Sequence, residues 1–226
     1  MYLYFYCYSY PGLTHYATPD FKCWTSEGSY GLATSNIAFI TGGPLVSSRG
    51  VRFINGYIDD EGEDNIGIGH RLYFLSPDLN AVSVGEIPQN LYNKRKTGSA
   101  VNVMDNYAEI DSMPIRDNGI FWPPPGYFPY ALLPKSKRWS YWPFHENNIF
   151  TQSTVTVTNN SGQLPVTIVF NDDTQFGTII VFEVTVPLIP PIQDEIYTVI
   201  INNIYDKNRN LVPPITYNVI LMNIRY

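Results

Sequence analysis

The chain has 226 residues, of which 44% are hydrophobic, 15% aromatic and 15% charged, so it can bury the core of one or two domains. Its formal net charge of -6, with only 14 lysines and arginines, leaves no basic surface for a nucleic acid. No apolar run approaches the roughly 20 residues that span a bilayer. The composition therefore excludes a disordered chain, the charge excludes a nucleic-acid-binding protein, and the short apolar runs exclude a transmembrane protein.

The first half of the chain predicts one helix and two short strands. Residues Val46 to Ile58 carry apolar side chains at the spacing of an amphipathic helix. Residues 81–84 and 101–103 are short runs containing valine, with turn-forming residues between them. A helix followed by strands favours a layered α/β domain.

A proline-rich tract, Trp122 to Pro129, follows this region. Proline fixes φ and lacks a backbone donor, so the tract is predicted to be an extended loop rather than a helix or a central strand. Its aromatic residues, Trp122, Tyr127 and Phe128, are expected to pack against the first domain. Presentation of a polyproline helix to a partner is the alternative.

The sequence changes character near Asn147, which predicts a domain boundary there. Beyond it, short runs rich in Val, Ile and Thr alternate with turn residues, a pattern typical of strands buried on one face. These runs predict an antiparallel sandwich of the immunoglobulin-like kind. They cover residues 154–158, 164–170, 178–186, 196–201 and 215–221.

A set of short motifs in a fixed order resembles the CAP superfamily of cysteine-rich secretory, antigen-five and pathogenesis-related proteins, also called SCP-like. The similarity is greatest to a microbial and protist branch that appends a β-sandwich. The motifs are Leu13-Thr14-His15, Phe21 to Thr25, Ser35 to Ala38, Gly56 to Gly62, Asn65, Gly69-His70-Arg71, Trp122 to Pro129 and Arg138-Trp139-Ser140.

The resemblance implies an α+β protein in two parts. Residues 1–147 would form a CAP-like α-β-α sandwich, and residues 148–226 an immunoglobulin-like antiparallel β-sandwich. The family's opening helix has no counterpart before His15, so the chain is expected to be truncated at its start. Secretion or display at the cell surface is also implied, although no signal peptide is recognisable in this chain.

The same resemblance implies a cleft in which histidines and acidic residues gather around a divalent metal. His15 and His70 match the two cleft histidines, and Asp59 or Asp60 stands near the second acidic position. Ser35 occupies the place of the family's first cleft glutamate, so the acidic set is incomplete.

The residues themselves leave several interpretations open. Two neutral imidazoles can bind zinc, with Asp59, Asp60 or Glu61 as a third ligand; otherwise the histidines make structural hydrogen bonds. The acidic run from Asp59 to Asp64 offers oxygen ligands for calcium but lacks the spacing of a calcium loop, and a solvated helix end is the alternative. Cys7 and Cys23 are either two thiols or a bridge.

The expected function is that of a secreted or surface binding module without catalytic activity. Its partner would be a small apolar ligand, such as a sterol or lipid, or a surface protein. The alternative is a zinc-dependent hydrolase or peptidase in which His15 and His70 hold the metal that activates water. A structural coat component is a third class, and it predicts a broad exposed apolar patch.

Overall fold

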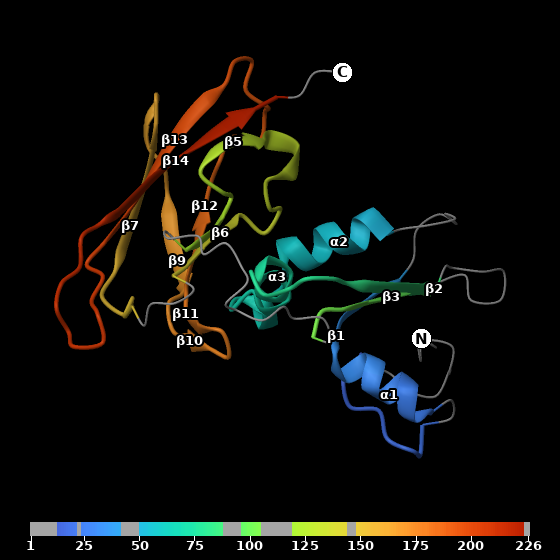
Figure 1. The fold of residues 1–226 in the computed structure, drawn as a ribbon. Helices are drawn as coiled ribbons and strands as arrows, with labels where there is room; N and C mark the ends of the chain where they lie inside the picture. The colour runs from blue at the N-terminus through green and yellow to red at the C-terminus, as the bar shows by residue number, and fades with distance from the viewer. Residues whose placement is uncertain are drawn as a thin grey trace. The chain divides into compact units, whose positions relative to one another are not determined.

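The computed structural model describes residues 13–21, 24–41, 50–87, 96–104, 119–143 and 148–223. The chain divides into two compact units, and each unit takes its residues from two stretches of sequence (Figure 1). The first unit comprises Met1–Ile58 and His70–Ile115, and the second comprises Asp59–Gly69 and Arg116–Tyr226. Cys7 and Cys23, whose pairing the sequence left open, lie outside the described residues.

The predicted fold class, an α+β protein that begins with a CAP-like α-β-α sandwich, is wrong. Strands make up 40% and helices 17% of the described protein, which contains three α-helices and four sheets and is therefore mostly β. The predicted antiparallel sandwich of residues 148–226 is also corrected, because strands before residue 147 belong to its sheets and one of them, β5 (Gly126–Pro129), pairs in parallel with β14 (Ile215–Met222). The coarser expectation of a β-sandwich is confirmed for the second unit, as described below.

The first unit contains a three-stranded antiparallel sheet in the order β1-β3-β2. These strands are β1 (Ser35–Thr41), β3 (Lys96–Asn102) and β2 (Ser83–Ile87). Strand β2 contains Ser83 and Val84 of the predicted run 81–84, and β3 contains Val101 and Asn102 of the predicted run 101–103. Strand β1 and helix α1 (Ser26–Ala33) were not predicted from the sequence. The first turn of α1 is capped by the Thr25 hydroxyl, which accepts from the Gly28 amide at 3.0 Å.

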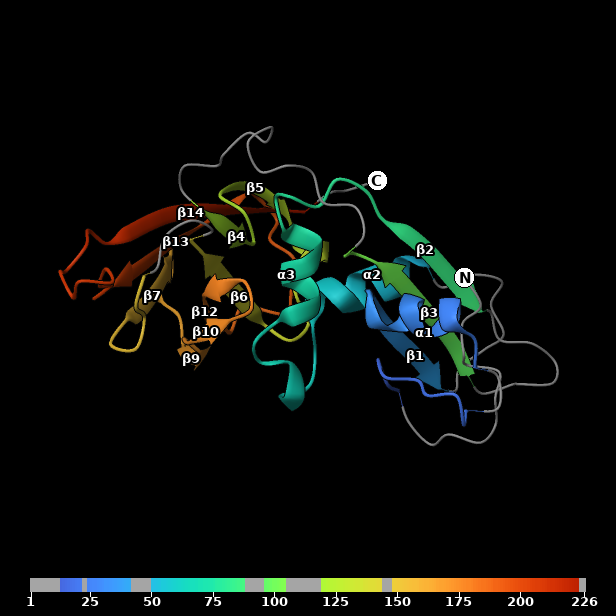
Figure 2. The same cartoon turned by 60° about the horizontal axis from the view of Figure 1, so that its bottom comes forward.

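Helices pack on both faces of this sheet. On one face, Leu32 of α1 packs with Ile37 and Ala100, which are cross-strand partners; Figure 2 shows α1 lying over this sheet. On the other face, Phe53 and Tyr57 pack with Val101 and Val103. Those two aromatic residues belong to α2 (Gly50–Asp59), which confirms the predicted helix over its described residues, and α3 (Gly69–Leu75) follows it.

The second unit contains two larger sheets. One has four strands in the order β4-β6-β12-β9, which are Ile120–Trp122, Arg138–Trp142, Ile180–Val184 and Val166–Phe170. The other has five strands in the order β5-β14-β13-β7-β8, which are Gly126–Pro129, Ile215–Met222, Glu195–Asn202, Thr154–Asn159 and Gly162–Gln163. A small hairpin of β10 (Asp173–Thr174) and β11 (Gly177–Thr178) and two 3-10 turns, Glu63–Asn65 and Tyr130–Leu132, complete the described elements.

One apolar core joins the two sheets into a sandwich. Alternate residues of β13 and β14, such as Val199 and Val219, are fully buried, and they pack in the same cluster as Phe182 of β12 and Trp139 of β6. Each of the five predicted runs beyond residue 153 overlaps one of the longer strands, β7, β9, β12, β13 and β14, whereas the two-residue strands β8, β10 and β11 were not predicted as separate strands. The predicted boundary at residue 147 falls between β6 and β7, two strands of this unit.

The proline-rich tract connects the edges of the two sheets. It begins at Trp122, which ends edge strand β4, and it closes with edge strand β5. Phe128 is buried in the core of the second unit and meets Trp122 edge-on, with the ring centroids 5.3 Å apart, whereas Tyr127 is 65% exposed. Trp122 and Phe128 therefore pack within the second unit, and the expectation of packing is wrong for Tyr127.

Candidate functional site

The first predicted metal ligand, His15, contacts helix α1. Its Nδ1 lies 2.7 Å from the main-chain carbonyl oxygen of Leu32. Because a carbonyl can only accept, this nitrogen carries the proton and donates. In a neutral imidazole, Nε2 would then be the ring nitrogen that can accept or bind a metal.

The second predicted ligand, His70, is the second residue of α3. Its main-chain carbonyl accepts from the Asn36 side-chain amide at 3.0 Å, and its ring lies beside that of Tyr57, with the centroids 5.5 Å apart. The Tyr57 hydroxyl donates to the Ser99 carbonyl at 3.1 Å, and burial raises the pKa of Tyr57 to about 12. Tyr57 packs on the sheet face opposite to α1, so the contacts of the two histidines lie on different faces.

The described part of the chain contains no group of three or more His, Cys, Asp or Glu side chains that could hold a metal ion. Zinc binding by His15 and His70, with Asp59 or Asp60 as a further ligand, therefore stays a prediction. Its direct test is calorimetric titration of zinc into the metal-free protein beside a His15→Ala/His70→Ala variant.

Asp59, the last residue of α2, uses its carboxylate to hold a turn of the second unit. Its two carboxylate oxygens accept from the backbone amides of Lys135 and Ser136 at 2.9 and 2.8 Å. The Ser136 hydroxyl donates to the Asp59 main-chain carbonyl at 2.9 Å. Each carboxylate oxygen therefore already accepts a hydrogen bond, which gives Asp59 a structural role.

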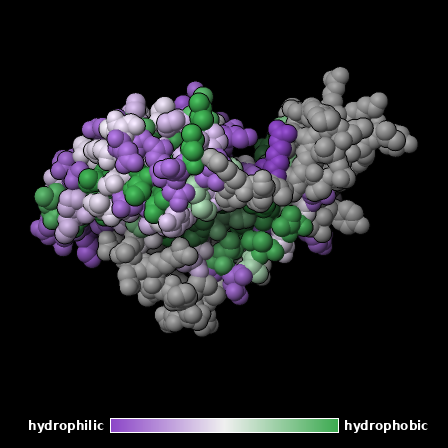
Figure 3. All heavy atoms as spheres, turned by 90° about the horizontal axis from the view of Figure 1, so that it is seen from above, coloured by the Kyte–Doolittle hydropathy of each residue, from purple (hydrophilic) through white to green (hydrophobic). Residues whose placement is uncertain are grey.

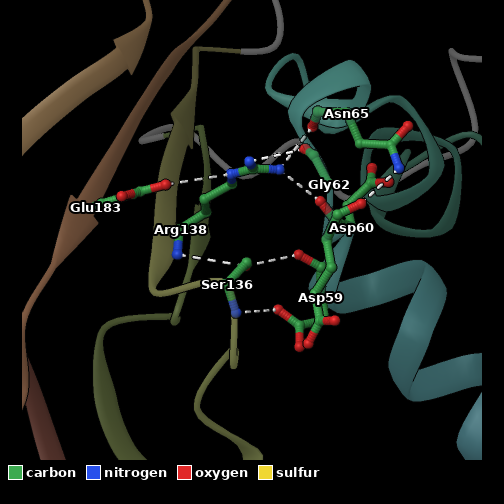
Figure 4. Close-up of polar contacts among 8 residues, drawn as sticks. Asp59, Asp60, Gly62, Asn65, Ser136, Arg138 and Glu183 are labelled. Carbon is green, nitrogen blue, oxygen red and sulfur yellow. Dashed lines mark hydrogen bonds and ion pairs between the residues drawn. The ribbon is translucent and has the colours of Figure 1, made fainter.

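The buried side chain of Arg138 hydrogen-bonds to the residues that follow Asp59 in the chain (Figure 4). Arg138 of β6 donates from its guanidinium to the main-chain carbonyls of Asp60 at 2.7 Å, Gly62 at 2.8 Å and Asn65 at 3.2 Å. Its Nε lies 3.6 Å from a carboxylate oxygen of Glu183. The segment 59–69 is in this way attached to the second unit by charge-assisted hydrogen bonds.

The acidic run is only partly the solvated helix end that the sequence suggested. Helix α2 does end at Asp59, but Asp59 and Asp60 are buried, with 8% and 1% of their surface exposed. Glu61 is exposed, and its pKa is raised above the ordinary value of 4.5 by partial desolvation and by the neighbouring Asp59 carboxylate.

Ser35, at the place of the family's cleft glutamate, lies in β1 opposite Asn102. It is 2% exposed, and within the described ranges its hydroxyl has no hydrogen-bond partner.

The feature of the second unit that the sequence analysis missed is an exposed loop between β12 and β13. We call residues Pro187–Gln193 the apolar loop. It contains three aliphatic side chains that are almost fully exposed: Leu188 at 90%, Ile189 at 80% and Ile192 at 83%. Figure 3 shows apolar side chains at the surface of the protein among hydrophilic ones.

The start of the apolar loop is attached to the second unit. Val186, just before it, packs against the core of the sandwich. The Tyr130 hydroxyl donates to the Pro187 carbonyl at 2.6 Å. Three of the seven loop residues are prolines, which restrict the backbone further. The aliphatic side chains are thus presented on a restrained backbone.

A sequence signal for this loop exists, although it has no period of two or 3.6. Pro-Leu-Ile-Pro-Pro-Ile places three aliphatic residues among three prolines between two predicted strands. Proline excludes the stretch from the interior of a sheet, so the aliphatic residues cannot be buried as strand residues. Aliphatic residues in a stretch that cannot be a buried strand are therefore the signal of an exposed apolar loop.

Comparisons with protein-family models, with curated proteins and with solved structures find no match for this chain. Nothing in them identifies it as a member of the CAP superfamily. Within the described ranges, every helix is too short or too polar to cross a membrane.

Proposed function

We propose that this chain is a non-catalytic binding protein that uses the apolar loop of its β-sandwich unit to bind an apolar partner surface. An extracellular or cell-surface location belongs to the same proposal. The observation that carries it is the exposure of Leu188, Ile189 and Ile192 on a backbone restrained by prolines and by Tyr130.

The energetics support binding at this loop. Burying an aliphatic side chain of this size contributes about 1.5–3 kcal/mol, so a partner that covered all three would gain on the order of 5 kcal/mol or more. A restrained backbone reduces the ordering cost that opposes such a gain.

The shape of the loop supports a surface partner rather than an enclosed ligand. Side chains that are 80–90% exposed do not line a closed cavity. Of the two partner classes expected from the sequence, a small apolar ligand and a surface partner, the proposal takes the second.

Retention on a phenyl matrix tests whether the loop is the principal accessible apolar surface. The full chain is compared with Leu188→Asp/Ile189→Asp/Ile192→Asp. The control is Leu211→Asp, because Leu211 is 64% exposed and lies in the connection from β13 to β14. Strand β13 separates the two connections, which places them at opposite ends of the sandwich (Figure 1).

The wild-type chain and the Leu211→Asp variant are expected to be retained, and the loop variant to elute much earlier. Circular dichroism confirms that all three chains are folded. Equal retention of the loop variant and the wild type would refute the proposed function.

A further inference from the structure

The chemistry of the apolar loop narrows the class of partner. Its six residues Pro187 to Ile192 carry no charged and no aromatic side chain. Protein–protein hot spots are enriched in Trp, Tyr and Arg, whereas leucine and valine are under-represented. Purely aliphatic side chains instead match an acyl-chain environment, which offers dispersion contacts and no hydrogen bonds.

The backbone of the loop agrees with an acyl-chain environment. A backbone N–H without a partner is costly in hydrocarbon. Proline has no N–H, so Pro187, Pro190 and Pro191 remove three of the six donors from this stretch. The Pro187 carbonyl is already paired with the Tyr130 hydroxyl. The same prolines make the loop unsuited to pairing as an added strand with a protein partner.

The apolar area of the loop is small for a stable protein interface. Three aliphatic side chains present at most a few hundred Å², whereas each partner in a stable complex buries roughly 800 Å². A second copy of this chain docked through the loop alone would therefore dissociate readily. Insertion into a bilayer needs no complementary protein surface, and its strength scales with the apolar area inserted.

The charged residues beside the loop give no excess of positive charge. Lys137 is exposed, and its main-chain carbonyl accepts from the Val184 amide at 3.0 Å, where β12 leads toward the loop. Asp194, also exposed, ends the connection before β13. Glu195, the first residue of β13, adds a second acidic group, so these residues give no preference for anionic headgroups, and the net charge of -6 on the whole chain disfavours them.

We propose that the apolar loop inserts Leu188, Ile189 and Ile192 into the surface of a zwitterionic lipid bilayer. This inference rests on the proposed function, in which the loop is a binding surface, and it names the partner. Tyr130, whose hydroxyl bonds to the Pro187 carbonyl, would lie behind the inserted side chains at the level of the headgroups, where tyrosine is common.

Co-sedimentation of the full chain with sucrose-loaded phosphatidylcholine vesicles tests this proposal. The wild type is compared with Leu188→Ser/Ile189→Ser/Ile192→Ser, with the single variant Ile189→Ser, and with Leu211→Ser as the matched control. We expect the vesicle partition coefficient to fall about tenfold or more for each inserted side chain replaced, and to stay unchanged in the control. Replacing a fifth of the lipid with phosphatidylserine should weaken binding slightly.

Three results would overturn the bilayer proposal: no binding of the wild type to vesicles, equal binding of the loop variants and the control, or binding only when phosphatidylserine is present. The first result, together with loop-dependent retention on the phenyl matrix, would leave the proposed function standing and assign the loop to a protein partner. Loss of both readouts would refute the proposed function as well.

Discussion

Replacement of Arg138 by methionine is expected to destabilise the second unit strongly. The guanidinium is buried with 6% exposure and donates to three main-chain carbonyls of the segment 59–69. Methionine fills a similar volume but donates nothing. The carbonyls of Asp60, Gly62 and Asn65 would lose a charged donor in a partly dry environment.

The size of the effect follows from the geometry. A hydrogen bond to a charged group contributes about 1.5–3 kcal/mol, and two of the three bonds are short, at 2.7 and 2.8 Å. The exposed neighbours of Gly62 allow water to reach the carbonyls, which reduces the loss. We therefore expect Arg138→Met to cost about 3 kcal/mol, near the lower end of the range for breaking a buried charged contact.

Urea unfolding followed by tryptophan fluorescence measures this cost. Trp122, Trp139 and Trp142 all belong to the second unit, so the signal reports mainly its unfolding. Glu183→Gln is the matched control, because Glu183 is 39% exposed and lies 3.6 Å from Arg138 Nε. That exposed pair should contribute less than about 1 kcal/mol.

Arg138→Lys should fall between the two variants, since one ammonium cannot reach all three carbonyls in the geometry of a guanidinium fork. A cost below about 1 kcal/mol for Arg138→Met would refute the reasoning, given the bond energies used above. Equal costs for Arg138→Met and Glu183→Gln would refute it too, because they would assign the stabilisation to the ion pair.

Three further predictions use the same unfolding assay. Tyr217→Phe should be neutral or stabilising by up to about 1 kcal/mol, because the buried hydroxyl has no hydrogen-bond partner within the described residues, and a clear loss of stability would contradict this. Gly119→Ala should cost more than about 2 kcal/mol, since φ is +78° and an added Cβ would lie 2.6 Å from the Trp142 carbonyl oxygen; a cost near zero would show that the backbone relaxes. Glu61→Gln should raise stability at pH 7 by less than about 1 kcal/mol, because the raised pKa of this exposed carboxyl means that its ionised form opposes folding beside Asp59. The benefit should vanish as the pH falls through the raised pKa toward 4.5, where Glu61 is protonated in the wild type; a benefit that grows at low pH would contradict the assignment.

Strands β13 and β14 were predictable from the sequence, and the reason is geometric. Strands such as β13 and β14 bury alternate residues, so the apolar pattern has a period of two. The strand β6 was missed because all five of its residues, Arg138–Trp142, are buried and no alternation exists. Edge strands β4 and β5 were missed because the prolines of the connecting tract indicate a loop.

The candidate sites depended on information that local patterns do not carry. The resemblance assigned Asp59 and Asp60 to a metal cleft, but the hydrogen bonds of Asp59 join residues 76 and 77 positions apart in the chain. Local periodicity says nothing about such long-range partners. The apolar loop was missed for a different reason, because its signal is aliphatic residues among prolines between two predicted strands and not a hydrophobic period.

The interleaving of the two units constrains how the protein can be divided into pieces. The chain passes from one unit to the other after Ile58, after Gly69 and after Ile115. A fragment that starts at Arg116 would lack the segment 59–69 and would leave the Arg138 guanidinium without its three carbonyl acceptors. An independently folding sandwich is more readily obtained by circular permutation, with residues 59–69 fused through a flexible linker to either end of 116–226.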